Sequence, residues 1–343
     1  MLAIGLDVHK KQTMVAMLDT QTGELSYRRI ATAQLVGQLA ALPQPMSLGL
    51  ETGAQSFFLA RQLLSLGLEV MVLDAFKVHR RAEAMHSAKT DRLDATALAR
   101  MVAEGGGDAT VWIADAQLDE LRSLTRTHRH LVQLGTALRN QIRAFIRHEG
   151  QDCPQQNLMG KRAGLWLDDF AATLAPGKQV ALAALRRGLQ DNVALIAQLQ
   201  LVMREVAQDN EAVRRLRTIC GCGLILALTL VAEIGDIWRF PRRKHLRGYC
   251  GLTPRVAQSG ETSHSGPLGR RGNPYLRHAL ILLAQNLARS KQIAGTGLKR
   301  FHGRHVARHG PNPAKVALGR KLCDIIFAML RNGTDFDLGR LAA

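Results

Sequence analysis

Short apolar runs bounded by turn residues alternate with helical stretches through the first third of the chain. Five runs have the length and composition of β-strands. They are Leu2–Asp7, Thr13–Leu18, Ser26–Ala31, Met46–Glu51 and Glu69–Leu73. The first three are separated only by a corner and a turn, so we expect them to pair as hairpins.

Helical patterns follow the third strand and separate the later ones. They occupy Leu35–Leu42, Gln55–Leu66 and Asp91–Val102, the last ending at three consecutive glycines. Three hairpin-linked strands, then helix, strand, helix and strand, is the element order of a ribonuclease-H-like α/β domain. We assign residues 1–106 to this domain.

The middle third, residues 107–210, is predicted to be helical. Two stretches carry apolar residues near heptad spacing. The first holds Leu121, Leu124, Leu131, Leu138, Ile142 and Phe145, and the second holds Leu182, Leu185, Leu189, Leu195, Leu199, Val202, Val206 and Val213. His128 and Gly135 interrupt the first stretch. Two interpretations stand: a coiled-coil arm that pairs within or between chains, and ordinary core helices.

The last third, residues 211–343, concentrates the positive charge. The chain has a net charge of +18, and this segment has 23 Lys and Arg against 7 Asp and Glu. Such a surplus in one segment indicates a polyanionic partner, most often nucleic acid. Aromatic residues are only 4%, which disfavours a protein that stacks single-stranded bases on aromatic rings.

The five cysteines are scattered and lack zinc-ligand spacing, so we interpret them as buried thiols in a reducing compartment. Neither a signal peptide nor an apolar stretch long enough to span a bilayer is visible. We therefore expect a cytoplasmic, nucleoid-associated protein with no membrane partner.

Two features of the last third concern its backbone. Residues 216–223 end in Gly221-Cys222-Gly223 before the apolar run Leu224–Ile234, which is typical of a helix-hairpin-helix turn whose N–H groups meet a phosphate. Residues Gly251–Pro274 are expected to form a long loop. Tyr275–Ala288 and Pro313–Leu330 are predicted as buried helices, with the basic segment Lys299–His309 between them.

Four carboxylates stand where a metal site of this fold would need them. Asp7 and Glu51 end the first and fourth strands, and Asp91 and Asp94 lie on one face at the start of a helix. Converging at one sheet edge, they would hold two Mg²⁺ ions about 4 Å apart. Lys89 could contact a phosphate nearby. The alternative is that each acid simply caps a turn or helix.

Four motifs occur together in one order: Ile4-Gly5-Leu6-Asp7-Val8, Leu50-Glu51-Thr52-Gly53, residues 89–95 (KTDRLDA), and Gly251-Leu252-Thr253-Pro254-Arg255. In these motifs the chain resembles the DEDD transposases of bacterial insertion sequences, the IS110 family and its IS1111 branch. The resemblance implies an N-terminal RuvC-like domain, a coiled-coil insertion and a mainly helical C-terminal transposase domain. It also implies that Asp7, Glu51, Asp91 and Asp94 bind metal and that a noncoding guide RNA directs the enzyme.

In that family a serine of a Ser-Gly pair after the fourth motif attacks DNA, and here the matching residue is Ser259. A serine hydroxyl is a weak nucleophile, but a bound Mg²⁺ that polarises the phosphate would favour its attack. Ser263 is the next candidate. The chain departs from the family at Cys220, where proline usually precedes the turn.

Arginine and lysine side chains are the candidates for nucleic-acid contacts. Those near the serine are Arg255, Arg270, Arg271 and Arg277, and those farther out are Lys299, Arg300, Arg304 and Arg308. The alternative is that they form a solvated basic surface.

The sequence thus predicts a guide-RNA-dependent DNA transposase that excises and inserts its element on double-stranded DNA. Its composite site would be completed in a homo-oligomer, a dimer or tetramer, and base pairing would supply the specificity. Two alternatives stand: a hydrolytic RuvC-like nuclease that uses the same acids with water, and a noncatalytic nucleic-acid-binding scaffold.

Overall fold

The computed structural model describes residues 1–85, 90–259, 262–269 and 271–339, with the backbone alone at 254–259 and 262–268. The chain forms two compact units, Met1–Asp115 and the remainder from Ala116 onward. Each unit is described by itself. The three-part division into residues 1–106, 107–210 and 211–343 stays a prediction.

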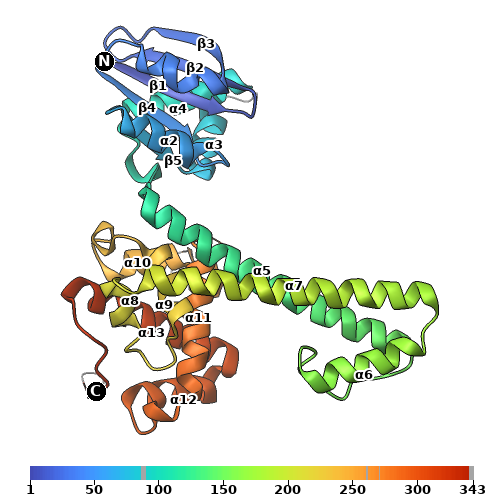
Figure 1. The fold of residues 1–343 in the computed structure, drawn as a ribbon. Coiled ribbons are helices and arrows are strands. Elements are labelled where there is room, and N and C mark those ends of the chain that lie inside the picture. Colours follow the sequence, from blue (N-terminus) through green and yellow to red (C-terminus); the bar gives the residue numbers. More distant parts are fainter. Residues whose placement is uncertain (86–89, 260–261, 270, 340–343) are drawn as a thin grey trace. The chain divides into compact units, whose positions relative to one another are not determined.

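The first unit is built on a six-stranded sheet with the order β3-β2-β1-β4-β5-β6 (Figure 1). Its strands are β1 (Leu2–Val8), β2 (Gln12–Asp19), β3 (Leu25–Ala31), β4 (Met46–Glu51), β5 (Glu69–Leu73) and β6 (Thr110–Val111). Strands β1 to β3 pair antiparallel, and β1, β4 and β5 run parallel. The five predicted strands are confirmed, and the mixed α/β sheet agrees with the expected ribonuclease-H-like order.

Helices cover both faces of this sheet. The helices α1 (Leu35–Ala40) and α2 (Ser56–Ser65) lie on one face, where Leu6, Leu48 and Leu50 are fully buried. The helices α3 (Ala75–Met85) and α4 (Asp91–Ala103) lie on the other face. Helix α3 was not predicted because it buries only two residues and so carries little apolar periodicity.

Two strand glycines allow α4 to approach the sheet closely. A Cβ atom on Gly5 would overlap the carbonyl oxygen of Ala95 and the amide nitrogen of Ala99. A Cβ atom on Gly49, its neighbour on β4, would overlap the side chain of Val102. The helix backbone therefore lies almost directly on β1, and its N-terminus is carried to the end of that strand.

We expect Gly5→Ala to destabilise the first unit by about 1–3 kcal/mol, because the added methyl group must displace the α4 backbone. Gly37→Ala is the matched control. It lies in α1 with nothing within 4 Å of the new methyl group, so it should stabilise by about 0.5–1 kcal/mol. Thermal melting of the full chain measures both. Equal effects of the two substitutions would contradict this account of the packing.

In its described residues the second unit consists of helices and one β-hairpin. Its helices are α5 (Ala116–His148), α6 (Lys161–Ala172), α7 (Pro176–Ala207), α8 (Glu211–Leu216), α9 (Leu224–Ile234), α10 (Arg243–Cys250), α11 (Pro274–Arg289), α12 (Gly297–His309) and α13 (Pro311–Asn332). The predicted helical C-terminal region is confirmed. Among the described helices, none combines the length and hydrophobicity needed to cross a bilayer.

The two long helices α5 and α7 lie side by side (Figure 1). At their far end α6 packs on them, and Ile142, Leu167, Phe170 and Leu182 share one buried cluster. Both long helices were predicted, although Val213, placed in the second stripe, belongs to α8. That the pair is a coiled coil stays a prediction.

The turn between α8 and α9 packs against α11. Gly221 has φ +81°, and a Cβ atom there would lie 2.8 Å from the Cβ of Asn286, whose side-chain amide donates to the Gly221 carbonyl. Cys222 is buried, and burial raises the pKa of its thiol to about 12, as expected for an inert packing residue. Phosphate binding by this turn stays a prediction.

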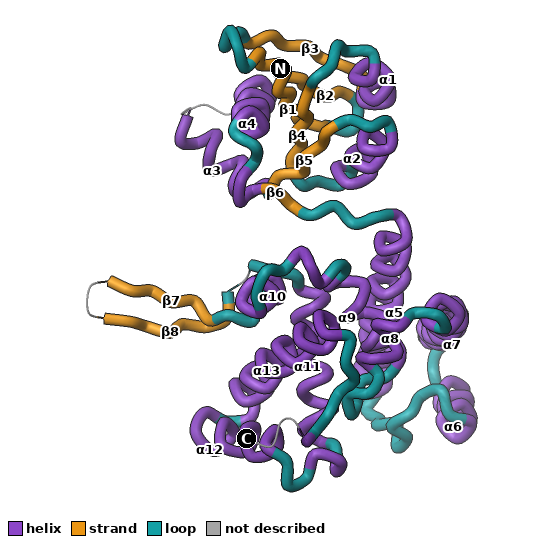
Figure 2. Tube along the Cα trace, turned by 90° about the vertical axis from the view of Figure 1, so that its left-hand side faces the viewer, coloured by secondary structure: helices purple, strands orange, loops and turns teal. Residues whose placement is uncertain are grey.

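The expected long loop over Gly251–Pro274 is wrong. The segment forms an antiparallel hairpin of β7 (Pro254–Ser259) and β8 (Thr262–Leu268), which Figure 2 shows projecting away from the helices of its unit. Its sequence lacks the apolar alternation of a half-buried strand, in agreement with a hairpin that no helix of its unit covers in the described backbone. Backbone pairing alone defines it.

Candidate active site

Asp7 lies near the end of β1 and faces α4. Gly5, two residues earlier on the same face, contacts α4, and alternate residues of a strand share a face. Only 8% of the Asp7 surface is exposed. A carboxylate this buried needs a cation or hydrogen-bond donors nearby.

The first turn of α4 brings two more carboxylates to this place. Thr90 caps the helix, its hydroxyl accepting from the Leu93 amide at 3.3 Å, so neither aspartate serves as the cap. Asp91 and Asp94 follow in the first turn. Because α4 lies directly on Gly5, this turn reaches the end of β1 beside Asp7.

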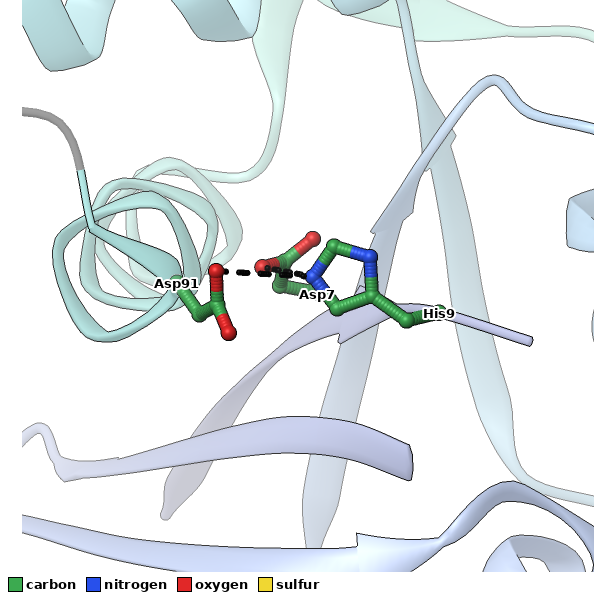
Figure 3. Close-up of side chains that lie close together, drawn as sticks. All are labelled: Asp7, His9 and Asp91. Atoms are coloured by element: carbon green, nitrogen blue, oxygen red, sulfur yellow. Dashed lines mark hydrogen bonds and ion pairs between the residues drawn. The ribbon is translucent and has the colours of Figure 1, made fainter. Parts of the chain in front are cut away.

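His9 links the acid of β1 to the first acid of α4. Its Nε2 atom lies 3.1 Å from Oδ2 of Asp7 and 3.6 Å from Oδ1 of Asp91 (Figure 3). One potential ligand atom from each of these three residues lies within 4.8 Å of the others, the arrangement a divalent cation needs. His9 was not among the site residues predicted from the sequence, where residues 9–11 form only the corner between the first two strands. The signal that could have found it is its spacing of two residues from Asp7.

Arg29 adds a cation at the edge of this cluster. Its Nη2 atom lies 4.0 Å from Oδ2 of Asp91. In the sheet register Arg29 pairs with Met14, and Met14 pairs with Asp7, so these residues form one row across three strands. Sequence reasoning also missed this exposed arginine.

The pKa of Asp7 is raised above its ordinary value. Burial is the largest cause; His9 lowers the pKa, and the charges of Asp91 and Asp94 raise it. The protein therefore holds three acids close enough to repel one another. A bound divalent cation would relieve that repulsion, so the residues present fit the predicted metal.

Glu51 ends β4 beside this cluster. Leu6 of β1 pairs with Leu50 of β4 in parallel register. Asp7 and Glu51 each follow these partners by one residue, so they are neighbours on adjacent strands, which lie about 5 Å apart. Glu51 also follows Gly49 by two residues and faces α4 as Asp7 does. It is half-buried, and it is not one of the three residues grouped above.

Several predicted site residues have no described side chain. Lys89 and Arg270 lie outside the described residues. Ser259 and Arg255 lie at opposite ends of β7, where only the backbone is described, and Ser259 pairs with Thr262 across the hairpin. Their contacts with DNA therefore stay predictions.

The remaining basic candidates belong to two places in the second unit. Arg277 donates to the carbonyls of Cys250 and Arg271, so it ties the hairpin ends together. Lys299 and Arg300 donate to backbone carbonyls of Ala288 and Gly295 respectively, each at 2.8 Å. Arg271, Arg304 and Arg308 are exposed.

We expect Mn²⁺ or Mg²⁺ to raise the melting temperature of the full chain, because a ligand that binds only the folded state stabilises it. Near 100 times its Kd the gain is about 2.7 kcal/mol. Asp7→Asn should abolish the shift, and His9→Asn should reduce it, because each change removes one potential ligand atom. His79→Asn, which removes an exposed histidine paired with Glu83, is the control. A full shift in Asp7→Asn would exclude the metal site.

Two transposase family models match this chain. The DEDD transposase model of IS110 matches residues 4–148, and the transposase model of the IS116/IS110/IS902 family matches residues 213–297. Together they cover more than half of the chain. The protein therefore belongs to the IS110 family of transposases.

Curated relatives agree with this membership. The transposase for insertion sequence element IS1111A of Coxiella burnetii is 27% identical over 98% of this chain and 91% of its own length. The transposase for IS1328 of Yersinia enterocolitica is 26% identical over 97% and 98% respectively. A pilin gene-inverting protein of Moraxella bovis is 33% identical over 37% of this chain and 39% of its own length.

Membership in this family has general consequences for partners, activity and metal binding. A transposase binds DNA, cleaves it and rejoins it, and a DEDD domain implies a divalent metal. The cluster around Asp7 is where the described part of the first unit can hold such a metal.

Proposed function

We propose that this chain excises and inserts its insertion sequence under the direction of a noncoding guide RNA, with Ser259 as the nucleophile. Asp7, Glu51, Asp91 and Asp94 would hold Mg²⁺, as a two-metal site. The observation that carries the proposal is the meeting of Asp7, His9 and Asp91 at the end of β1, with Asp94 beside them.

The proposed chemistry is a transesterification. The Oγ atom of Ser259 attacks the phosphorus, the bond from phosphorus to one strand oxygen breaks, and that oxygen leaves as a hydroxyl after gaining the serine proton through solvent. A phosphoserine diester keeps the energy of the broken bond. A hydroxyl from another strand then attacks the same phosphorus and releases Ser259. Bound divalent cations would supply positive charge to the phosphate oxygens.

Positive charge in the second unit supports nucleic-acid partners. Arg300, Arg304 and Arg308 recur every four residues on α12, so they share one face. This basic face of α12 is our candidate for contact with RNA or DNA phosphates. Sequence specificity would come from base pairing with the RNA, because the charge pattern supplies affinity without reading bases.

The exposed surface of the long helix α7 supports assembly into a dimer or tetramer. Leu195, Val202 and Val206 of α7 are each more than two-fifths exposed and recur near helical spacing. Such an exposed apolar stripe favours pairing with a second copy. The homo-oligomer, acting on DNA in the cytoplasm, would complete each site in cis or in trans.

A plasmid that carries this gene with its natural flanking DNA tests the function. We expect excised circles to be detected by amplification across the new junction, to vanish when the noncoding flank is deleted, and to return when that flank is transcribed from a second plasmid. Excision that continues without any transcript of the flank would contradict RNA guidance.

A further inference from the structure

The two ends of the β7–β8 hairpin cross in direct backbone contact. Gly251 has φ +64° and Gly272 has φ +101°, and a Cβ atom on Gly272 would lie 2.7 Å from the nitrogen of Gly251. Beside this crossing the amide of Asn273 donates to the carbonyl of Tyr249 at 2.7 Å. The hairpin therefore leaves the helices from a fixed base.

Arg277 fastens the same base from α11. Its Nε atom donates to the Cys250 carbonyl at 3.1 Å, and its Nη2 atom donates to the Arg271 carbonyl. One guanidinium thus holds the chain before the hairpin to the chain after it.

The side chain of Asn273 connects the hairpin base to α11, to Glu233 and to Tyr249. Its Oδ1 atom caps α11 by accepting from the amides of Tyr275 and Leu276 at 2.9 and 3.0 Å. Its Nδ2 atom donates to Oε2 of Glu233 at 2.7 Å and to the hydroxyl of Tyr249 at 3.0 Å. Both side-chain donors and the acceptor are in use, so the orientation of the amide is fixed.

Glu233 connects Asn273 to the core of the unit. This glutamate of α9 is fully buried, and Arg126 of α5 binds it with two hydrogen bonds of 2.7 and 2.8 Å. Arg126 also lies 4.6 Å from the centre of the Tyr275 ring. The Arg126 side chain is partly exposed, but the Glu233 carboxylate has no access to solvent, so it depends on Arg126 and Asn273 for its hydrogen bonds.

The length of the hairpin makes the geometry of its base important. Ser259 stands five residues beyond Pro254, about 17 Å along an extended strand. A tilt of about 5° at the base would move the serine by about 1.5 Å, and a misplacement of about 1 Å in a reacting group costs on the order of 10²-fold in rate.

We propose that Asn273, held by the Glu233–Arg126 pair, is a positioning residue that fixes the hairpin base and so aims Ser259 at the phosphate. This inference rests on the proposed function, since it assumes that the hairpin carries the nucleophile. It assigns to the Glu233–Arg126 pair a role in the reaction that acts through the hairpin base.

Asn273→Ser tests the proposal because serine keeps a cap for α11 but loses both Nδ2 hydrogen bonds. With the full chain, a transcript of the noncoding flank and a nicked duplex carrying the element end, we expect single-turnover cleavage to fall roughly 30- to 100-fold at saturating DNA. The Kd for the duplex should change less than about twofold. Hydrogen exchange of residues 249–253 and 271–277 should rise, while α13 is unchanged. Asn210→Ser, at the cap of α8, is the control and should leave both readouts unchanged.

Wild-type cleavage by Asn273→Ser, or unchanged exchange at the hairpin base, would overturn the proposal. If that variant fails to fold, Tyr249→Phe removes one acceptor of the Asn273 amide, and with it the hydrogen bond from Arg239 to the same hydroxyl. It should give smaller changes of the same sign, and no change would again overturn the proposal. Failure of the proposed function is distinguishable, because Ser259→Ala would then cleave normally while Asn273→Ser still loosened the base.

Discussion

Ser259→Ala should abolish excision, with a loss of roughly 10³-fold or more, because it removes the hydroxyl proposed to form the phosphoserine bond that preserves the energy of the cut. The measurement is the frequency of excised circles from a plasmid carrying the gene and its natural flanks. Protein amount and melting temperature should stay near those of the wild type, since the hairpin packs under no other element in the described backbone.

Ser263→Ala is the matched control for this result. Ser263 lies on β8 opposite Gln258, in the same hairpin, and its loss should leave excision near the wild-type frequency. If Ser259→Ala still produced circles while Ser263→Ala did not, the nucleophile would be reassigned. If neither change mattered, water would be the better nucleophile and the hydrolytic nuclease would be favoured.

Asp7→Asn should also reduce excision by on the order of 10³-fold, because it removes the most buried carboxylate of the predicted metal site. Asp19→Asn is the control. Asp19 is likewise a carboxylate at a strand end, but it only accepts the Gln21 amide at 2.8 Å in a turn, and asparagine can accept the same bond. Equal losses in both variants would show that the effect is not specific to the cluster.

Asp7→Asn should also stabilise the folded protein when metal is removed by EDTA. The pKa of Asp7 is raised, chiefly by burial, so the folded state disfavours the ionised carboxylate. The stability that Asp7 contributes is present below its unfolded pKa of about 3.9 and is lost as pH rises through the higher folded pKa. The melting temperature of Asp7→Asn should therefore exceed that of the wild type at pH 7, and the difference should shrink toward pH 4. If Asp7→Asn instead melted at a lower temperature than the wild type at pH 7, burial of the ionised Asp7 carboxylate would not be destabilising, and this account would be contradicted.

The fold of the first unit was largely predictable because most of its strands are short apolar runs in the sequence. Met46–Glu51 and Glu69–Leu73 were predicted with their observed bounds, since each is a short apolar run ended by turn residues. Helix α3 was missed because only Val78 and Ala82 of it are buried. The β7–β8 hairpin was missed because its residues have the composition of a loop and its order comes from backbone pairing.

The candidate site was predictable only in part. The positions of Asp7, Asp91 and Asp94 followed from their places at a strand end and a helix start, and the structure brings their charges together. His9 was not found because its contact with Asp91 depends on how closely α4 approaches β1, which Gly5 and Gly49 set. The Asn273–Glu233–Arg126 network joins residues far apart in the chain, so no local pattern indicates it.

Mass spectrometry of the protein–DNA adduct tests most directly whether the acids of the first unit and the hairpin serine act on one phosphodiester. The full chain is incubated with flank transcript, nicked duplex and Mg²⁺, then digested with nuclease and trypsin. We predict a nucleotide on Ser259 within the tryptic peptide of residues 256–270, and none with Asp7→Asn or EDTA. A nucleotide carried by another residue, or an adduct on Ser259 that forms equally well in Asp7→Asn, would contradict the account.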